Sequence, residues 1–274
     1  MRFELQLSRH LVDLLLKEKT AVITGPAKGM GRAISMALAK EGVNLALLGR
    51  DIGAIEPVVE DAEHLGVKAK AFNCDVTEGY MVEQAIRDVI SWTKKIDILV
   101  NVAGGTGPIG KTGLETSEAE FDEIVKLNLG GVFSVIKEVA PLMKKAGGGK
   151  IINIGGTFGM RGRAMRLSYS SSKWGLRGLT KSFALELGRY NINVNLVAPG
   201  MVDGPRFREK VVPQVASQFN ISEEAAVNKH CEDYALGRIS EDQDIANAVI
   251  FLASERARQI TGVDLPVDGG WAAL

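Results

Sequence analysis

The sequence predicts an α/β fold, in which one parallel β-sheet carries helices on both of its faces. Three observations lead to this prediction. Short apolar or β-branched runs alternate with longer amphipathic runs along the chain. A strand, a glycine-rich turn and a helix follow one another near the N-terminus, and no linker, repeat or low-complexity stretch interrupts the alternation. Continuous apolar strands are typical of a sheet buried on both faces, and regular strand–helix alternation makes the strands parallel.

The composition is that of one ordinary globular chain. Its 274 residues, 46% of them hydrophobic, are enough for a large core, and single α/β sheets of this size are common. The 33 basic and 33 acidic residues cancel, so no overall field attracts nucleic acid or an anionic membrane. No apolar run reaches the ~18 residues of a membrane span. Cys74 and Cys231 lack metal-ligand spacing. We therefore expect a cytoplasmic protein with reduced thiols, no metal site, and no nucleic-acid or membrane partner.

Residues 1–18 are predicted to form an extension ahead of a single domain that spans residues 19–274. They contain a leucine-rich patch interrupted by charged residues, Glu4, Arg9 and Asp13 among them. A signal peptide would have an uninterrupted apolar core and a small-residue cleavage site. The patch therefore favours a short amphipathic leader that packs on the body of the protein.

The first strand, expected at residues 20–24, leads through a glycine turn into a helix expected at residues 32–40. This order is the context that a dinucleotide-binding loop requires. Glycines let the backbone approach a pyrophosphate, and the helix N-terminus offers free N–H groups and the positive end of the helix dipole. The spacing is G-x-x-x-G-x-G, and without these neighbours it would indicate only a turn. The predicted phosphate-binding loop is Gly25-Pro-Ala-Lys28-Gly29-Met30-Gly31.

The remaining elements alternate in the same way and bring the total to seven strands. Further strands are expected at residues 43–48, 67–73, 96–100, 150–154, 192–197 and 263–267. Further helices are expected at residues 52–65, 77–92, 117–145, 167–188 and 241–253. The segment 201–236 mixes apolar and charged residues as a helical lid over a pocket does; we refer to it as the lid.

Tyr169 and Lys173 form the candidate catalytic pair. Residues four apart lie one turn apart on the same helix face, with ~6 Å between their Cβ atoms. A nearby ammonium favours the phenolate and lowers a pKa that is otherwise ~10. A phenol tuned in this way can pass a proton to or from a substrate oxygen. The Y-x-x-x-K pattern is common by chance, and the nucleotide loop upstream is what makes it informative.

With these motifs the chain resembles the short-chain dehydrogenase/reductase family from about Lys19 to the C-terminus. The resemblance implies a Rossmann-type, doubly wound sheet, a nicotinamide cofactor, and hydride transfer on the carbonyl or alcohol of a small-molecule substrate. It also implies a homo-oligomer, with a tetramer expected, because the long predicted helices leave apolar faces for a partner. The matching segments are Thr24–Gly31, Asp75-Val76, Asn101-Val-Ala-Gly104, Asn128, Tyr169-x-x-x-Lys173 and Pro199-Gly200.

The resemblance also implies roles for individual residues. Tyr169 would be the general acid/base, and Lys173 would modify its pKa and bind the nicotinamide ribose hydroxyls. Asn128 would be the helix asparagine whose backbone anchors a water in the proton relay. The other implied contacts all belong to the cofactor: Asp75 and Val76 frame the adenine, Asn101, Ala103 and Gly104 line the adenosine side and hold the fourth strand, and Pro199 and Val202 lie at the nicotinamide.

Gly156 departs from the family pattern, since it stands thirteen residues before Tyr169, where the family has a catalytic serine. That serine hydrogen-bonds the substrate oxygen, and losing such a donor costs ~2.7–4 kcal/mol in comparable sites. Three interpretations stay open. The neighbouring Thr157 supplies the hydroxyl, the glycine admits a bulkier substrate with its own donor, or the chain is a non-catalytic dinucleotide-binding regulatory protein. The retained Tyr169, Lys173 and Asn128 favour an enzyme. Gly204 is a second departure, replacing a threonine that commonly follows the proline by five positions.

The end of the second strand bears on the choice between NAD and NADP. An acid there bonds the 2′-hydroxyl of the adenine ribose, whereas a 2′-phosphate needs positive charge. Here the acidic position is Gly49, Arg50 follows it, and Lys28 is a second cation in reach. Asp51 leaves NAD possible. We expect a preference for NADP(H).

Three arginines precede the catalytic tyrosine: Arg161, Arg163 and Arg166. They could receive a carboxylate, phosphate or sulfonate of the substrate through bidentate bonds. Alternatively they form a solvated face or part of a subunit interface.

Overall fold

A computed structural model, which describes residues 12–205 and 207–273, contains one seven-stranded parallel sheet and confirms the predicted fold class. The strand order is β3-β2-β1-β4-β5-β6-β7. The order reverses between β1 and β4, and open α/β sheets bind ligands at such a switch point, outside the carboxyl ends of the strands. The strands are β1 (Thr20–Thr24), β2 (Asn44–Gly49), β3 (Ala69–Asn73), β4 (Ile98–Asn101), β5 (Gly149–Ile154), β6 (Ile192–Pro199) and β7 (Asp264–Val267).

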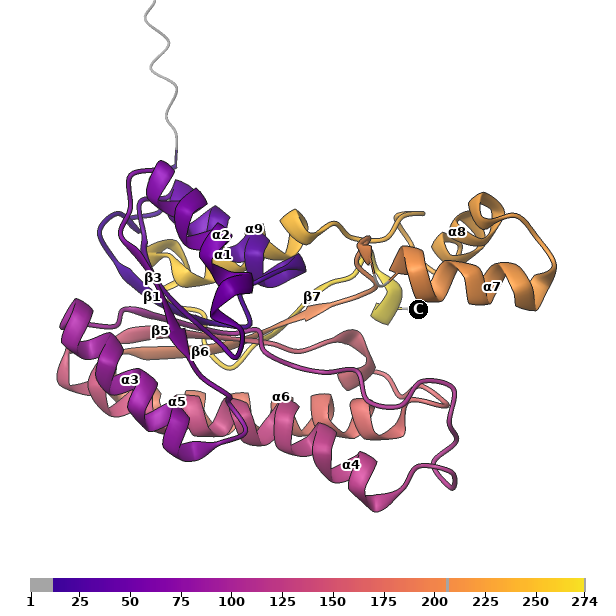
Figure 1. Ribbon diagram of the computed structural model, residues 1–274, viewed down its shortest axis with the longest axis horizontal. Coiled ribbons are helices and arrows are strands. Elements are labelled where there is room, and N and C mark those ends of the chain that lie inside the picture. The colour runs from indigo at the N-terminus through magenta and orange to yellow at the C-terminus, as the bar shows by residue number, and fades with distance from the viewer. Residues whose placement is uncertain (1–11, 206, 274) are drawn as a thin grey trace, which may run out of the picture.

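Helices cover both faces of the sheet (Figure 1). One layer contains α1 (Gly29–Lys40), α2 (Ile52–His64) and α9 (Asp242–Ala253), and the other contains α3 (Gly79–Thr93), α4 (Glu118–Val125), α5 (Gly131–Lys145) and α6 (Leu167–Leu187). Two separate apolar cores result, one on each face of the sheet. Because both faces are covered, β1, β4 and β6 are buried at every position. This explains why these strands read as continuous apolar runs.

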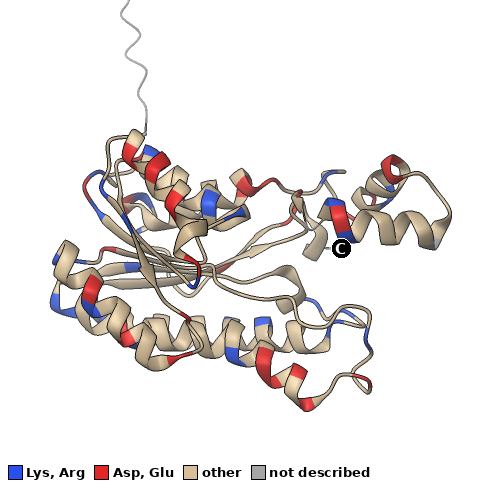
Figure 2. Ribbon diagram, in the orientation of Figure 1, with Lys and Arg blue, Asp and Glu red and all other residues tan. Residues whose placement is uncertain are grey.

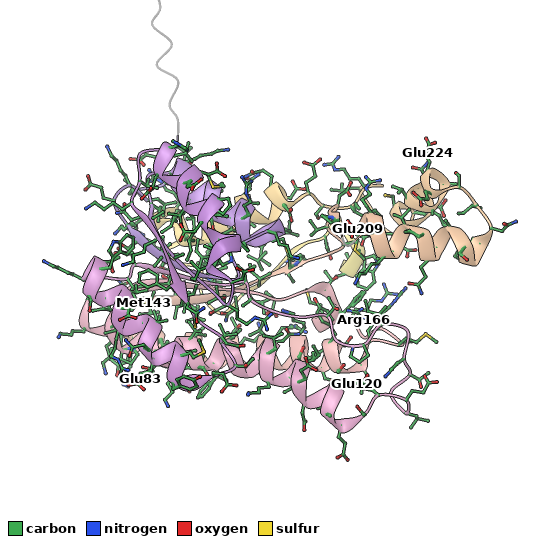
Figure 3. The ribbon with its side chains drawn as sticks, viewed as in Figure 1. Glu83, Glu120, Met143, Arg166, Glu209 and Glu224 are labelled. Carbon is green, nitrogen blue, oxygen red and sulfur yellow. The ribbon has the colours of Figure 1, made fainter. Side chains whose placement is uncertain are left out.

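Most charged side chains lie on the outside of this three-layered body, and Lys150, Lys173 and Asp268 are among the few that are buried. Figure 2 shows acidic and basic residues of both signs distributed along the helices. In Figure 3, Glu83, Glu120 and Glu224 lie at the outer edges, whereas Met143 lies over the body, where it is fully buried in the core on the α5 side. None of the described helices has the length and apolar character needed to cross a lipid bilayer.

The helical zone predicted over residues 117–145 is confirmed, and it consists of three consecutive helical segments. Between α4 and α5 a π-helical turn covers Lys126–Gly130. Gly131 follows it at a close approach, because a Cβ there would lie 2.7 Å from Cγ2 of Val76. Single π-turns within α-helices often occur at functional sites, and this one carries Asn128.

The lid contains α7 (Val212–Phe219) and α8 (Glu223–Cys231), which follow a π-helical turn at Phe207–Val211. The two helices project beyond the carboxyl edge of the sheet (Figure 1). They form their own small apolar cluster around Phe207, which is 1% exposed. The lid is therefore attached to the body through few core contacts.

The predicted N-terminal extension lies outside the described residues up to position 11. Val12 is exposed, and the chain begins to pack on the body at Leu14. Leu16 is buried in the core beside α1 and α9, and Arg256 Nε donates a hydrogen bond to the Asp13 carbonyl at 2.8 Å.

Candidate active site

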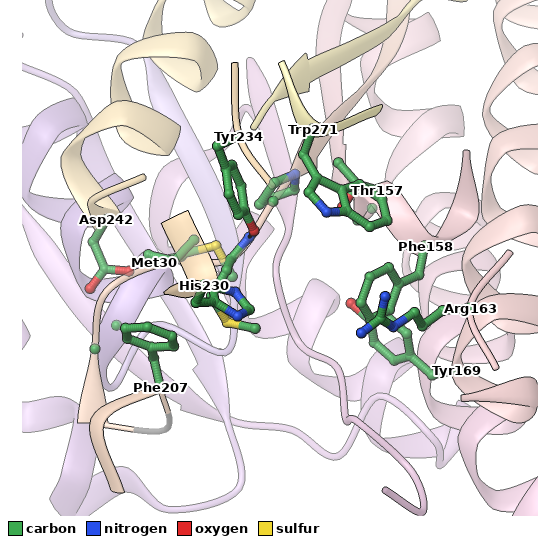
Figure 4. A pocket seen from close by; sticks show the side chains of 18 of the residues that line it. Met30, Thr157, Phe158, Arg163, Tyr169, Phe207, His230, Tyr234, Asp242 and Trp271 are labelled. Atoms are coloured by element: carbon green, nitrogen blue, oxygen red, sulfur yellow. Dashed lines mark hydrogen bonds between the residues drawn. The ribbon is translucent and has the colours of Figure 1, made fainter. Parts of the chain in front are cut away.

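The carboxyl ends of β1, β5 and β6, the start of α6 and the lid enclose a cavity of about 330 Å³ (Figure 4). Parallel strands end at a common edge, so motifs far apart in the sequence meet there. The cavity brings together six of the predicted site residues: Lys28, Gly29, Met30, Tyr169, Pro199 and Val202. Gly156, Thr157 and Gly204 also line it.

The glycine loop is built by the end of β1 and by the segment that follows β4. Thr24 Oγ1 accepts hydrogen bonds from the amides of Val102 (3.0 Å) and Ala103 (3.1 Å). Gly25 has a φ of +67°, and a Cβ there would lie 3.0 Å from the Ala103 Cα. A side chain at this position would therefore be strained twice, by its backbone conformation and by its neighbour.

Gly31 serves a purpose that the sequence did not indicate. It is buried, and a Cβ at this position would overlap the Gly25 carbonyl. The glycine therefore lets α1 pack against its own loop. Lys28, the N-cap residue of α1, makes no side-chain capping bond. The first amides of the helix are thus left for a ligand, which is the environment that a pyrophosphate requires.

The end of β2 carries Gly49 in place of an acid, and a larger residue there would require the Ile55 side chain to shift. A Cβ there would lie 2.8 Å from Cδ1 of the buried Ile55. Asp51 is engaged elsewhere, because its carboxylate caps α2 by accepting a hydrogen bond from the Ala54 amide at 3.1 Å. Arg50 is 80% exposed at the side chain and lies 3.9 Å from Asp75. This corner offers positive charge to a ligand, as a 2′-phosphate would need.

Asp75 closes a turn with Thr77. Its Oδ1 accepts hydrogen bonds from the Thr77 amide (2.9 Å) and hydroxyl (2.8 Å). Burial opposes ionisation of this carboxyl, but these bonds and the charges of Arg50 and Lys126 together hold its pKa below the ordinary value. The following residue, Val76, is buried, so an adenine would meet mainly the backbone of this pair.

Asn101 differs from the prediction that it lines the adenosine side. Its side chain is buried and donates to Asn153 Oδ1 at 2.9 Å. Asn153 in turn donates to the Thr180 hydroxyl at 3.0 Å. The chain of bonds joins β4, β5 and α6 inside the core. Asn101 therefore holds the fourth strand, as expected, but with its side chain directed into the interior.

The side chain of Asn128 connects three segments by hydrogen bonds: its own π-turn, the loop at Gly105 and helix α6. Its Oδ1 accepts a hydrogen bond from the Gly105 amide at 2.8 Å, and its Nδ2 lies 3.0 Å from both the Gly105 carbonyl and the Ser172 hydroxyl. Ser172 donates to the Tyr169 carbonyl at 2.7 Å. The side chain is fully buried and all of its bonds are structural. Only the backbone of Asn128 is left for the predicted contact with water.

Tyr169 and Lys173 lie on one face of α6, as their spacing predicts. The Lys173 ammonium is 5.8 Å from the centre of the Tyr169 ring and donates to the Ile154 carbonyl at 2.8 Å. Lys173 is 6% exposed, and burial lowers its pKa from the ordinary 10.5 to about 8. Ala103 and Gly104 run beside the pair, since a Cβ on Gly104 would lie 3.8 Å from the ammonium.

The buried ammonium predicts a specific pH dependence of stability. Between pH 8 and 10.5 the unfolded chain holds a proton on Lys173 that the folded chain has lost. The free energy of unfolding should therefore rise with pH across this window, by about 3 kcal/mol in total, and be independent of this group below it. Chemical denaturation of the cofactor-free protein and of Lys173→Met at several pH values measures the difference. Equal pH slopes for both proteins would contradict the prediction.

Gly156 brings the backbone close to the catalytic tyrosine. Its backbone is extended, with a φ of 164°, and a Cβ there would lie only 2.8 Å from the Tyr169 hydroxyl. The tyrosine hydroxyl thus occupies the place where a serine side chain would begin. Thr157, which is 4% exposed and lines the cavity, is the adjacent hydroxyl. Among the described residues, apart from its chain neighbours, no atom lies within 4 Å of a Cβ on Gly204.

Val202 keeps its backbone groups available at the cavity. It forms an isolated parallel bridge with Ser240. That bridge uses the Met201 carbonyl (3.1 Å) and the Asp203 amide (2.8 Å). The N–H and C=O of Val202 itself are not used in it, as the predicted contact with a carboxamide would require.

Several residues of the cavity were not predicted. Phe158 packs edge-on against Tyr169 at 6.2 Å and lies 5.5 Å from Trp271. His230 and Tyr234 reach the cavity from the lid and its end. Each is an ordinary residue in its local sequence, and only the packing of the C-terminal segment and the lid brings them to the site. Within the described part of the chain, no group of three His, Cys, Asp or Glu side chains could hold a metal ion.

Comparison with known proteins gives matches over most of the chain. The profile described as short chain dehydrogenase matches residues 19–215. The 3-oxoacyl-(acyl-carrier-protein) reductase FabG of Staphylococcus epidermidis is 37% identical over 255 residues, covering 92% of this chain and 98% of the relative. A protein of the same name from Thermotoga maritima is 33% identical over 257 residues, covering 93% of this chain and 98% of the relative.

Solved structures give the same result. NAD+-bound xylitol dehydrogenase superposes with a TM-score of 0.88 at 29% identity, covering 93% of this chain and all of the other. The actinorhodin polyketide ketoreductase with NADPH superposes with a TM-score of 0.87 at 31% identity, covering 94% of this chain and 98% of the other.

Proposed function

Because the chain belongs to the short-chain dehydrogenase/reductase family, we propose that it is an NADP(H)-dependent oxidoreductase acting on the carbonyl or alcohol of a small molecule. The observation that carries the proposal is the position of Tyr169, which lines the cavity with the Lys173 ammonium 5.8 Å from its ring. A protein that only binds a dinucleotide has no need of this pair. Gly156 is the departure that motivated the non-catalytic alternative, and the retained Tyr169 and Lys173 favour an enzyme.

In the proposed mechanism, Tyr169 exchanges a proton with the substrate oxygen, and NADP(H) would supply or accept the hydride. Lys173 stabilises the phenolate by its charge and binds ribose hydroxyls. The backbone of Asn128 holds a water that returns the proton to solvent. Thr157 hydrogen-bonds the substrate oxygen as negative charge develops, in place of the family's serine.

The cofactor is bound at three places in this proposal. The glycine loop, with Gly25, Gly29 and Met30, receives the pyrophosphate at the α1 N-terminus. The turn after β3 meets the adenine. Pro199 and Val202 contact the nicotinamide through their backbone. These assignments are supported by the uncapped first turn of α1 and by the backbone groups of Val202.

The preference for NADP(H) rests on Arg50 and Lys28. Gly49 has no side chain that could accept a hydrogen bond from a ribose hydroxyl, and Asp51 is used as a helix cap. The relatives do not decide the question, since the ketoreductase structure contains NADPH and the xylitol dehydrogenase structure contains NAD+.

Titration of NADPH and NADH into the cofactor-free protein tests this preference. A hydrogen bond to a charged group contributes about 1.5–3 kcal/mol, so NADPH should bind about 10 to 100 times more tightly. Arg50→Gln should weaken NADPH and leave NADH unchanged. Equal or tighter binding of NADH to the unmodified protein would contradict the proposal. A panel of ketones and 3-oxoacyl thioesters, followed by the absorbance of the reduced nicotinamide, then tests turnover.

We also propose a homotetramer located in the cytoplasm. The cysteines Cys74 and Cys231 are free thiols, as expected for a reducing compartment. Large apolar side chains on α5 and α6 are exposed in a single chain, Phe133, Trp174 and Leu185 among them. Such side chains are typical of subunit contacts.

A further inference from the structure

The walls of the cavity carry charges of both signs. Of the described residues that line it, Lys28, Arg163 and Arg166 are basic, whereas Asp233 and Asp242 are acidic. Charges of both signs in similar number give the cavity no single-sign field that would select an anion or a cation. Selection among substrates therefore depends on the uncharged groups of the walls.

Most of the uncharged wall is apolar. The rings of Phe158 and Trp271 lie 5.5 Å apart, with their planes tilted by 56°. Phe207 of the lid lines the cavity as well, and Figure 4 shows it on the side opposite Phe158. Walls of this kind hold the body of a small molecule by apolar contact, and a few polar groups fix its orientation.

His230 is the residue through which the lid brings an uncharged polar atom to this cavity. It lies in α8, and its imidazole is 5.2 Å from the Phe207 ring and 5.8 Å from the Tyr234 ring. Its Nε2 is buried and has no hydrogen-bond partner among the described residues. The Tyr234 hydroxyl beside it already accepts a hydrogen bond from the Met201 amide at 3.1 Å. Because an unsatisfied buried nitrogen is costly, a ligand atom that bonds to Nε2 gains affinity by removing this cost.

The charge state of His230 decides which atoms it can bind. Burial lowers the pKa of His230 below the ordinary value of 6.5, while the charges of Asp233 and Arg163 act on it in opposite directions. At neutral pH the imidazole is therefore uncharged. One nitrogen of a neutral imidazole is a donor and the other an acceptor, so Nε2 can donate to a carbonyl or accept from a hydroxyl.

We propose that the substrate carries a second, uncharged oxygen apart from the carbonyl or alcohol that reacts, and that Nε2 of His230 hydrogen-bonds this oxygen. Figure 4 shows His230 and Tyr169 on different sides of the cavity. The two residues would hold the substrate at two points, with its apolar body between them, and would thereby orient the reacting carbon. This inference rests on the proposed function, because it takes Tyr169 as the site of reaction. The cavity of about 330 Å³ must also admit the nicotinamide end of the cofactor, so the substrate is small.

Pairs of ketones that differ in one oxygen test the inference. The pairs are 4-hydroxybutan-2-one with pentan-2-one, 3′-hydroxyacetophenone with 3′-methylacetophenone, and cyclohexane-1,4-dione with cyclohexanone. With NADPH as the reductant, the ketone with the second oxygen should have a kcat/KM about 5 to 100 times that of its partner in at least one pair. This is the range expected when one buried polar group is satisfied by one ligand and left unsatisfied by the other.

Variants of His230 show whether the preference comes from this side chain. His230→Phe keeps an aromatic ring between Phe207 and Tyr234 but removes both nitrogens, so the preference should be lost. His230→Gln places an amide at about the reach of Nε2 and should keep part of the preference, whereas His230→Asn reaches only as far as Nδ1 and should lose it. Intrinsic reactivities of the ketones are the same for every variant, so a change in the ratio reports the contact. The matched control is His64→Asn, an exposed position at the end of α2 that does not line the cavity, and it should keep the preference.

Calorimetric titration of the NADP+-bound protein gives a readout without turnover. 3-Hydroxybenzamide should bind more tightly than 3-methylbenzamide by a similar factor, and His230→Phe should bind the two equally. A preference in either measurement that depends on His230 supports the inference. Equal affinities together with equal kcat/KM within every pair would overturn it, and so would a preference that His230→Phe retains in full. A protein that binds no dinucleotide, or that binds one and reduces no ketone, would contradict the proposed function instead.

Discussion

Tyr169→Phe is expected to reduce turnover by about 10²–10⁴-fold or more and to leave the affinity for NADPH nearly unchanged. General acid–base catalysis by a positioned side chain contributes a factor of this size. The ring would still pack edge-on against Phe158 and Lys173 would still lie beside it, so the variant removes a hydroxyl and little else. Single-turnover measurement with the best substrate, together with NADPH titration, separates chemistry from binding.

Tyr234→Phe is the matched control, because Tyr234 lines the same cavity and is buried. Its hydroxyl accepts a hydrogen bond from the Met201 amide at 3.1 Å, which contributes about 1 kcal/mol. We expect its loss to change the rate by less than about tenfold. If the unmodified protein and Tyr169→Phe turn over the substrate at the same rate, Tyr169 is not the acid/base.

Thr157→Val is expected to reduce kcat by about 10²–10³-fold. Removing one donor from an oxyanion site costs about 2.7–4 kcal/mol, and Thr157 is the buried hydroxyl next to the position of the family's serine. Valine keeps the shape of the side chain and removes only the donor. An unchanged kcat in a folded Thr157→Val protein would show that the substrate oxygen is stabilised by another group.

Gly156→Ser, the change that would restore the family's serine, is expected to lower activity. A Cβ at this position would lie 2.8 Å from the Tyr169 hydroxyl, so the tyrosine would have to move away from the substrate. Gly156→Ala imposes the same crowding without a hydroxyl and should lose as much. A serine variant that is more active than both the alanine variant and the unmodified protein would refute the steric argument.

The sequence predicts the fold well because its strongest signals are local. Each strand is a short apolar run bounded by glycine or polar residues, and seven strands lie where these runs lie. The motif residues Lys28, Tyr169 and Pro199 also meet as expected, because parallel strands end at one edge and a helix face repeats every turn.

What the sequence could not predict depends on packing between distant segments. Asn101 ends β4, one residue beyond the predicted strand, and its partner Asn153, 52 residues away, holds the side chain in the interior. His230 and Trp271 carry no motif and reach the cavity only through the path of the lid and the C-terminus. The crowding at Gly156 depends on where the Tyr169 ring lies in the folded protein. Residue types alone do not reveal that position.

The π-turn between α4 and α5 has a consequence for chain length. Successive residues of an α-helix are rotated by about 100° around its axis. A turn that closes over five residues in place of four therefore holds one residue more than a regular helix would, and it resets the rotational phase of everything that follows. Deleting a single residue within Lys126–Gly130 would allow one straight helix. It would also turn Ile124 of α4 relative to Val132 and Val135 of α5. The number of residues in this segment is therefore fixed by the packing of α4 and α5, although every position in it is helical.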